Sequence, residues 1–295
     1  MIGFASPTFW QLRTRRLNLP HAGSSPLRPL VMGIVNVTPD SFSDGGRHDS
    51  VDAAVAHGMQ LVAEGADILD VGGESTRPYS TPVPVDEESR RVAEVVRRLA
   101  AESGVPVSID TSKAAVARRA IDLGAEIIND VTGLEGDPDM LGVARDTGAG
   151  ICAMHMRGTP QTMQDDPHYD DVVAEIHAYL AARRDALLAA GIPLEKICLD
   201  PGIGFGKTHA HNRELMAHAD RFLDLGTPIL VGHSRKGFIG KSLEQALGRP
   251  ASRDEIDAAT ATMARDLAAV GIQIVRVHAV GRVRAALEQS GTIPS

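Results

Sequence analysis

Residues 33–46 read GIVNVTPDSFSDGG, a strand-like stretch that runs into a polar, glycine-rich loop. An almost continuous apolar run from Leu30 to Val37 predicts a strand that is covered on both faces. Pro39 ends any hydrogen-bonded ladder, and Asp44 followed by two glycines is typical of a turn. Asn36 stands where the strand becomes the loop. Such an Asn is as readily a turn former as a ligand, so its interpretation depends on whether the same arrangement recurs.

The junctions between helices and strands do recur. Around 64–68, 123–127, 147–151 and 270–274, a Gly ends a helical pattern and an apolar strand begins one or two residues later. This repetition indicates a series of αβ units. Helices are expected between the strands, among them residues 86–102 and a long one over 169–190. The expected strands are 31–37, 68–71, 105–109, 126–128, 151–154, 197–199, 228–231 and 274–277.

Alternating strands and helices demand parallel strands with right-handed crossovers. Eight units predict an α/β protein with a single (β/α)8 TIM-type barrel, and favour it over an open doubly wound sheet. The chain of 295 residues has room for such a barrel in one domain. We expect residues 29–295 to form it and residues 1–28 to be an N-terminal extension. Trp10 is expected to pack this extension onto the barrel.

Composition narrows the class of partner. The net charge of −8 and the lack of a basic stripe make nucleic acid an unexpected partner. No apolar run reaches the ~18 residues of a membrane span, and the N-terminal segment lacks the apolar core of a secretory signal. Cys152 and Cys198 lie in apolar strands, which suits buried thiols in a reducing cytoplasm. A cytoplasmic protein with small-molecule partners is expected.

Polar residues end the expected strands again and again. In a parallel barrel these ends open onto one face, which holds the active site. Carboxylates and an amide suit a nitrogen-rich heterocycle, and the basic side chains suit a phosphate group. The first set is Asp110, Asn129 and Asp200, and the second is Arg77, Lys236, Arg276 and His278. Asp70, Asp130 and His155 also stand at strand ends, and a single such residue is often only a helix cap or a packed side chain.

The segment 202–208 looks like a phosphate-binding Walker A loop, but Pro201 stands where that motif needs Gly. We do not expect a nucleotide site there, although a backbone anion nest stays open. No Cys/His spacing suggests structural zinc.

Taken together, the strand ends resemble the dihydropteroate synthase family of folate biosynthesis over nearly the whole chain from Pro29. The resemblance implies a TIM-type barrel and the condensation of 6-hydroxymethyl-7,8-dihydropterin pyrophosphate with 4-aminobenzoate. The products would be 7,8-dihydropteroate and pyrophosphate. The motifs that carry it, in order, are residues 36–46, 70–78, 108–111, 128–130, 154–158, 200–208, 234–236 and 276–278.

The resemblance also assigns roles. The implied pterin-binding residues are Asp110, Asn129, Met154, Asp200 and Lys236. The implied pyrophosphate-binding residues are Asn36, Arg77, Arg276 and His278. The implied aminobenzoate-binding residues are Phe42, Thr76, Pro78, Phe205 and Ser234. The implied catalytic residues are Asp110, Lys236, Arg276 and His278. Asn36 would also bind Mg²⁺, residues 38–46 would act as a lid, and the family implies a homodimer and a target of sulfonamides.

The chain departs from the family pattern at Ala279, where Asp commonly follows the histidine and could orient it. Two alternatives remain at this point. A pterin-binding methyltransferase domain would share the barrel but has no pyrophosphate to bind, and a catalytically inactive paralogue would need no intact polar ring.

Overall fold

The computed structural model describes residues 7–20, 28–37 and 47–289. Its centre is an eight-stranded parallel sheet with the order β8-β7-β6-β5-β4-β3-β10-β9. A parallel bridge between Leu199 and Ile229 joins the two end strands and closes the barrel, as predicted. The strands are β3 (Leu30–Asn36), β4 (Ile68–Gly72), β5 (Val107–Asp110), β6 (Ile127–Asp130), β7 (Gly150–Met154), β8 (Ile197–Asp200), β9 (Leu230–Val231) and β10 (Ile274–Val277).

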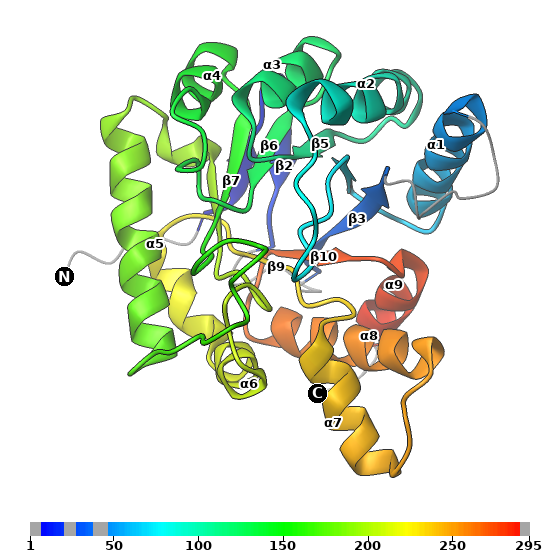
Figure 1. Cartoon of the computed structure of the whole chain (residues 1–295), viewed down its shortest axis with the longest axis vertical. Helices are drawn as coiled ribbons and strands as arrows, with labels where there is room; N and C mark the ends of the chain where they lie inside the picture. The colour runs from blue at the N-terminus through cyan, green and yellow to red at the C-terminus, as the bar shows by residue number, and fades with distance from the viewer. Residues whose placement is uncertain (1–6, 21–27, 38–46, 290–295) are drawn as a thin grey trace.

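Helices surround the barrel on its outside (Figure 1). They are α1 (Arg47–Ala63), α2 (Val85–Glu102), α3 (Ala114–Asp122), α4 (Met140–Thr147), α5 (Val172–Ala189), α6 (His209–Ala217), α7 (Gly237–Leu247), α8 (Arg253–Ala269) and α9 (Val280–Gln289). Short 3-10 turns, η2 (Leu194–Lys196) and η3 (Ala219–Leu225), precede β8 and β9. The start of α5 corrects the expected range 169–190. Asp171 caps this helix by accepting a hydrogen bond from the Ala174 N–H, so Tyr169 lies in the preceding loop.

The repeated glycine junctions have the conformation that requires glycine. Gly65, Gly124, Gly148 and Gly271 have φ angles of 99°, 109°, 64° and 97°. A side chain is strained in this left-handed region, so glycine ends each helix and turns the chain into the next strand.

Apolar side chains form two layers. The larger packs the outer faces of the strands against the helices. The smaller layer fills the interior of the barrel toward the amino-terminal ends of the strands and includes Met32, Ile68 and Ile274. An antiparallel hairpin of β1 (Phe9–Gln11) and β2 (Arg16–Asn18) adds Trp10, which is fully buried in this layer. The Trp10 indole N–H donates to the Lys196 carbonyl at 3.0 Å, so the extension covers the amino-terminal end of the barrel.

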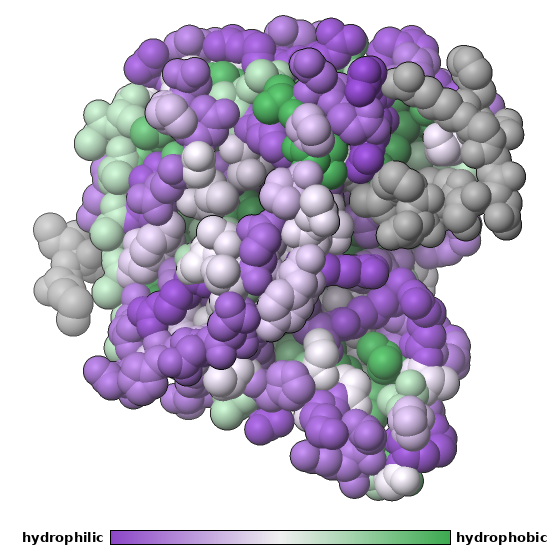
Figure 2. All heavy atoms as spheres, in the orientation of Figure 1, coloured by the Kyte–Doolittle hydropathy of each residue, from purple (hydrophilic) through white to green (hydrophobic). Residues whose placement is uncertain are grey.

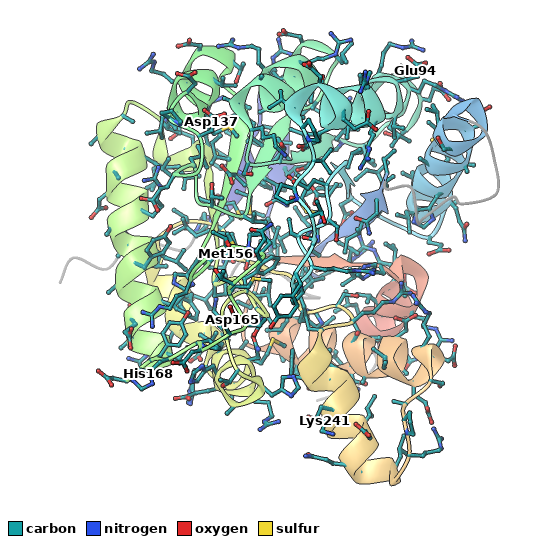
Figure 3. All side chains as sticks on the ribbon, viewed as in Figure 1. Glu94, Asp137, Met156, Asp165, His168 and Lys241 are labelled. Carbon is teal, nitrogen blue, oxygen red and sulfur yellow. The ribbon has the colours of Figure 1, made fainter. Side chains whose placement is uncertain are left out.

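The surface is mostly hydrophilic on the face shown in Figure 2, with apolar residues in small groups. Glu94 and Lys241, on α2 and α7, lie at the outer edge of the molecule (Figure 3). In the described part of the chain, no helix has the length and apolar character needed to cross a membrane. Cys152 and Cys198 are both buried free thiols, as expected, and face each other in register on β7 and β8.

Candidate active site

The interior of the barrel changes from apolar to polar toward the carboxyl ends of its strands. On β4, Ile68 belongs to the smaller apolar layer and Asp70 follows two residues later. On β10, Ile274 and Arg276 repeat this order. Because alternate residues of a strand point to the same side, the polar residues share the interior with the apolar layer beneath them. The polar end is the face on which barrel enzymes carry their active sites.

Arg276 is at the centre of this polar layer. Its Nε donates to Asp70 Oδ2 at 2.6 Å, and its Nη2 donates to Asp110 Oδ2 at 2.6 Å. Asn129 Nδ2 donates to the same Asp70 oxygen at 3.1 Å. Three of the sequence-predicted residues are therefore brought together: Asp70 joins Arg276 to Asn129, and Arg276 holds Asp110 directly.

Burial controls the protonation of the carboxyls. It raises the pKa of Asp110 to about 7, although the Arg276 charge opposes this shift. Burial likewise raises the pKa of Asp200 to about 6, against a hydrogen bond from the Gly202 N–H at 2.7 Å. Both groups can therefore change charge near neutral pH, which is unusual for aspartate and typical of functional sites.

Gly232 separates Asp200 from Arg276. A Cβ placed on Gly232 would lie 3.8 Å from Asp200 Oδ2 and 3.9 Å from Arg276 Cβ, so the missing side chain leaves room beside both groups. Met154 pairs in register with Asp200 and packs in a small apolar cluster with Phe205. The predicted pterin residues thus combine polar edges with an apolar wall, which suits a flat heterocycle.

Lys236 lies over this wall. Its Nζ is 4.0 Å from the centre of the Phe205 ring, a cation–π contact. Burial, followed by repulsion from Arg276, lowers the pKa of Lys236 to about 8. Lys236 is also the residue before α7, so its backbone begins that helix while its side chain turns toward the site.

His278 is held by Ser234. Ser234 Oγ lies 3.0 Å from His278 Nδ1 and also accepts the His278 backbone N–H at 3.2 Å. Burial and the nearby Arg235 and Arg276 lower the pKa of His278 to about 3. Burial among these cations disfavours the positive charge that the sequence suggested for His278. Ser234 supplies the orientation that the residue at position 279 cannot.

Asn36 ends β3 on the same face. It is in register with Gly72, which is in register with Asp110, so the three stand in one row across neighbouring strands. Phe42 and the expected lid over 38–46 lie outside the described residues. No group of three or more His, Cys, Asp or Glu residues suited to a metal occurs in the described ranges.

The loop after β4 carries Thr76, Arg77 and Pro78. Thr76 is half-buried, whereas Arg77 and Pro78 are exposed. Tyr79 has a φ of 63° and donates its N–H to the Pro160 carbonyl at 2.9 Å, which ties this loop to the loop after β7. Figure 3 marks Met156 and Asp165 on that second loop, and Asp165 Oδ1 accepts the Tyr79 hydroxyl at 3.2 Å. The role of Arg77 as an anion ligand stays a prediction.

Comparison with known proteins agrees with this geometry. The family model described as "Pterin binding enzyme" matches residues 32–278. A curated dihydropteroate synthase of Escherichia coli K12 is 47% identical over 252 residues, which cover 85% of this chain and 87% of the relative.

The chain belongs to the dihydropteroate synthase family.

Solved structures of the family also superpose closely. A Xanthomonas albilineans synthase with 4-aminobenzoic acid has a TM-score of 0.85 and 44% identity, covering 98% of this chain and 100% of that one. A synthase of the same species with 7,8-dihydropteroate has a TM-score of 0.82 and 42% identity, with 97% and 100% covered. A Yersinia pestis synthase bound to a sulfonamide drug has a TM-score of 0.84 and 40% identity, with 97% and 100% covered.

The Walker-like segment 202–208 is not a nucleotide loop. Lys207 is buried; its Nζ lies 3.0 Å from His155 Nδ1 and donates to the Phe205 carbonyl at 2.9 Å. Burial lowers the pKa of His155 to about 3, so His155 is the packed histidine that the sequence left open. Lys207 therefore braces the loop that carries Phe205, and its ammonium group is occupied by these protein contacts.

Asp70 is the site residue that the role assignments omitted. Its position near the end of an expected strand was the available signal, but the same signal also marks Asp130. Asp130 binds its own loop, accepting hydrogen bonds from the Thr132 and Leu134 N–H groups at 2.8 and 3.2 Å. Only the direction of each side chain separates the site residue from the loop former.

Proposed function

We propose that this chain condenses 6-hydroxymethyl-7,8-dihydropterin pyrophosphate with 4-aminobenzoate to give 7,8-dihydropteroate and pyrophosphate. The observation that carries the proposal is that Arg276, at the mouth of one barrel, binds Asp110 directly and is linked to Asn129 through Asp70. The substrate has to combine a polar heterocycle with an anion. Relatives that hold 4-aminobenzoic acid or 7,8-dihydropteroate support this choice of substrate and product.

The pterin edge is assigned to Asp200, Asn129 and Lys236. Asp200 accepts from ring N–H and amino donors, whereas Lys236 donates to a ring oxygen or nitrogen. Met154 and Phe205 cover a face of the ring. These contacts orient the methylene carbon that reacts.

The pyrophosphate is assigned to Arg276, His278, Arg77 and Asn36. A phosphate oxygen competes with Asp110 for the Nη2 end of Arg276, since both are anions that fit a guanidinium. Binding of pyrophosphate thereby frees the Asp110 carboxylate. Neutral His278 contributes as an N–H donor and not as a charge.

Asn36 fits a magnesium ion that arrives with the pyrophosphate. Mg²⁺ takes oxygen ligands, keeps several waters and binds substrate phosphates, so one amide oxygen at the strand end is an adequate protein contribution. A dedicated protein cage is neither needed nor present among the described side chains. Asn36 would hold the ion, which would supply positive charge to the leaving pyrophosphate when bound.

The reaction is assigned a dissociative course. The bond between the methylene carbon and the pyrophosphate oxygen breaks, and its electron pair leaves with pyrophosphate. Arg276 and His278 stabilise the leaving group, and the freed Asp110 stabilises the positive charge on the pterin. The aminobenzoate nitrogen then attacks the methylene carbon and gives up a proton, which the released pyrophosphate takes up. A structure of the enzyme with the pterin intermediate and pyrophosphate trapped in the site should show no covalent bond between the pterin and a side chain.

The aminobenzoate is assigned to the space between Phe205, Ser234 and the loop with Thr76 and Pro78. Sulfonamides should compete here, as analogues of the second substrate. The proposal also includes that the protein is a homodimer and acts in the cytoplasm.

The proposal is tested by measuring pyrophosphate release with both substrates and Mg²⁺, with dihydropteroate followed by chromatography. We expect one dihydropteroate for each pyrophosphate, and no dihydropteroate without aminobenzoate. Binding of both substrates without product would indicate an inactive paralogue instead.

A further inference from the structure

The polar layer of the barrel depends on one residue that needs no contact with either substrate. Asp70 is 0% exposed, and its Oδ2 receives both Arg276 Nε at 2.6 Å and Asn129 Nδ2 at 3.1 Å. Its other oxygen, Oδ1, is buried and meets no donor in the described part of the chain. The charge of Asp70 is therefore balanced by Arg276, the Asn129 amide adds a second hydrogen bond, and each donor is in turn fixed by Asp70.

The two carboxylates that hold Arg276 differ in accessibility. The Asp110 side chain is 11% exposed, and the Asp70 side chain is 0% exposed. An anion that enters from the mouth of the barrel can displace Asp110 from the Nη2 end of the guanidinium. It cannot reach the Nε end without first removing Asp70. Arg276 therefore has one fixed end and one exchangeable end.

Asp70 also fixes the polarity of Asn129. An ionised carboxylate only accepts hydrogen bonds, so the amide nitrogen of Asn129 must face Asp70. The amide oxygen then faces away from Asp70 and is left to accept from a ring N–H. Without Asp70 the amide could turn over and would present a donor where the ligand also has a donor.

We propose that Asp70 is a positioning residue that holds Arg276 and Asn129 in the orientations required by the anion and by the heterocycle, so that one buried carboxylate couples the two halves of the site. The identity of the two ligands rests on the proposed function, whereas the coupling does not. Asp70 itself contacts neither ligand.

The test uses binding of two separate probes, inorganic pyrophosphate with Mg²⁺ and 6-hydroxymethylpterin without phosphate, measured by calorimetry. Asp70→Asn should weaken each probe about tenfold, the effect of one charged hydrogen bond. In an Asn129→Ala background, the same change should alter pterin binding less than about twofold while still weakening pyrophosphate. In an Arg276→Lys background, Asp70→Asn should no longer weaken pyrophosphate binding but should still weaken pterin binding.

The matched control is Ser108→Ala. Ser108 is in register with Asp70 on β5, is fully buried and has a hydroxyl without a partner among the described residues. Its removal should leave both affinities unchanged. Equal losses from Asp70→Asn in all backgrounds would overturn the proposal, because they would indicate general destabilisation of the barrel.

A second measurement covers the case in which Asp70→Asn does not fold. In a crystal of the unmodified protein with pyrophosphate and Mg²⁺, Arg276 Nε should stay on Asp70 while Nη2 leaves Asp110. Release of Nε from Asp70 would refute the fixed end. Failure of the proposed function is distinguishable, since it would appear as absence of dihydropteroate even where both probes bind as expected.

Discussion

Arg276 Nη2 lies 2.6 Å from Asp110 Oδ2. The residue assigned to bind pyrophosphate and the residue assigned to stabilise the pterin cation therefore pair with each other in the free site. The pair keeps two buried charges compensated before substrate enters. It also means that binding of the anion and release of the carboxylate are one event. The consequences can be tested residue by residue.

Asp110→Asn should separate chemistry from anion binding. The variant loses the carboxylate that stabilises the pterin cation, so we expect kcat to fall about 100-fold or more. Affinity for inorganic pyrophosphate should stay the same or increase, because Arg276 loses a competitor. Steady-state kinetics and calorimetry measure the two effects. A parallel loss of pyrophosphate affinity would contradict the exchange of partners.

The pH profile of kcat/KM should reflect Asp110 and Lys236 in the free enzyme. Activity requires Asp110 ionised, so it should rise through the Asp110 pKa of about 7. It requires Lys236 protonated, so it should fall as pH passes the Lys236 pKa of about 8. Lys236→Arg should move the alkaline limb of the profile to higher pH, since arginine stays charged. An unmoved alkaline limb in this variant would assign that limb to another group.

The stability of the ligand-free protein should depend on Asp110 in the opposite direction to activity, because ionisation of Asp110 lowers the free energy of unfolding. Its folded pKa of about 7 lies above the ordinary value of 3.8, so the folded state binds the proton more tightly. The contribution of Asp110 to the free energy of unfolding therefore falls as pH rises from about 4 to about 7. Urea unfolding measures the free energy of unfolding of Asp110→Asn and of the unmodified protein at each pH. The value for the variant minus the value for the unmodified protein should rise over this window and level off above it. A constant difference would show that the folded pKa is not raised.

His278 should act as a neutral donor. Burial lowers its pKa to about 3, so it carries no charge at neutral pH in the free site. His278→Gln keeps a side-chain N–H and should reduce kcat/KM by no more than about tenfold, whereas His278→Ala should lose roughly 100-fold. Equal losses in the two variants would show that an N–H at this position is not sufficient.

Asn36→Ala should affect the anion far more than the ring. Pyrophosphate binding in the presence of Mg²⁺ should weaken about tenfold or more, whereas binding of 6-hydroxymethylpterin should change less than about twofold. Omission of Mg²⁺ from the unmodified protein should reproduce the same selective loss. If both probes weaken equally, Asn36 does not hold the metal.

Much of the fold follows from local patterns. Glycine after a helix, as at Gly148, and the apolar strand that follows it define one αβ unit wherever they occur, because a positive φ and a buried strand are local requirements. The predicted start of α5 was wrong by three residues, because the Asp171 side chain caps the helix and the preceding residues belong to the loop. The Tyr169 hydroxyl donates to the Gly206 carbonyl at 2.9 Å, 37 positions away, and keeps Tyr169 in the loop.

The sequence by itself determined the order of strands and helices and the polar residue at the end of each strand, because periodicity and turn chemistry act between near neighbours. It therefore also determined that these residues share the mouth of one barrel. Only the tertiary structure decided which of them pair. Arg276 meets Asp70 across 206 positions of the chain and Asp110 across 166. Such partners are set by strand register and by which side chains point inward, and both are fixed only when the barrel closes.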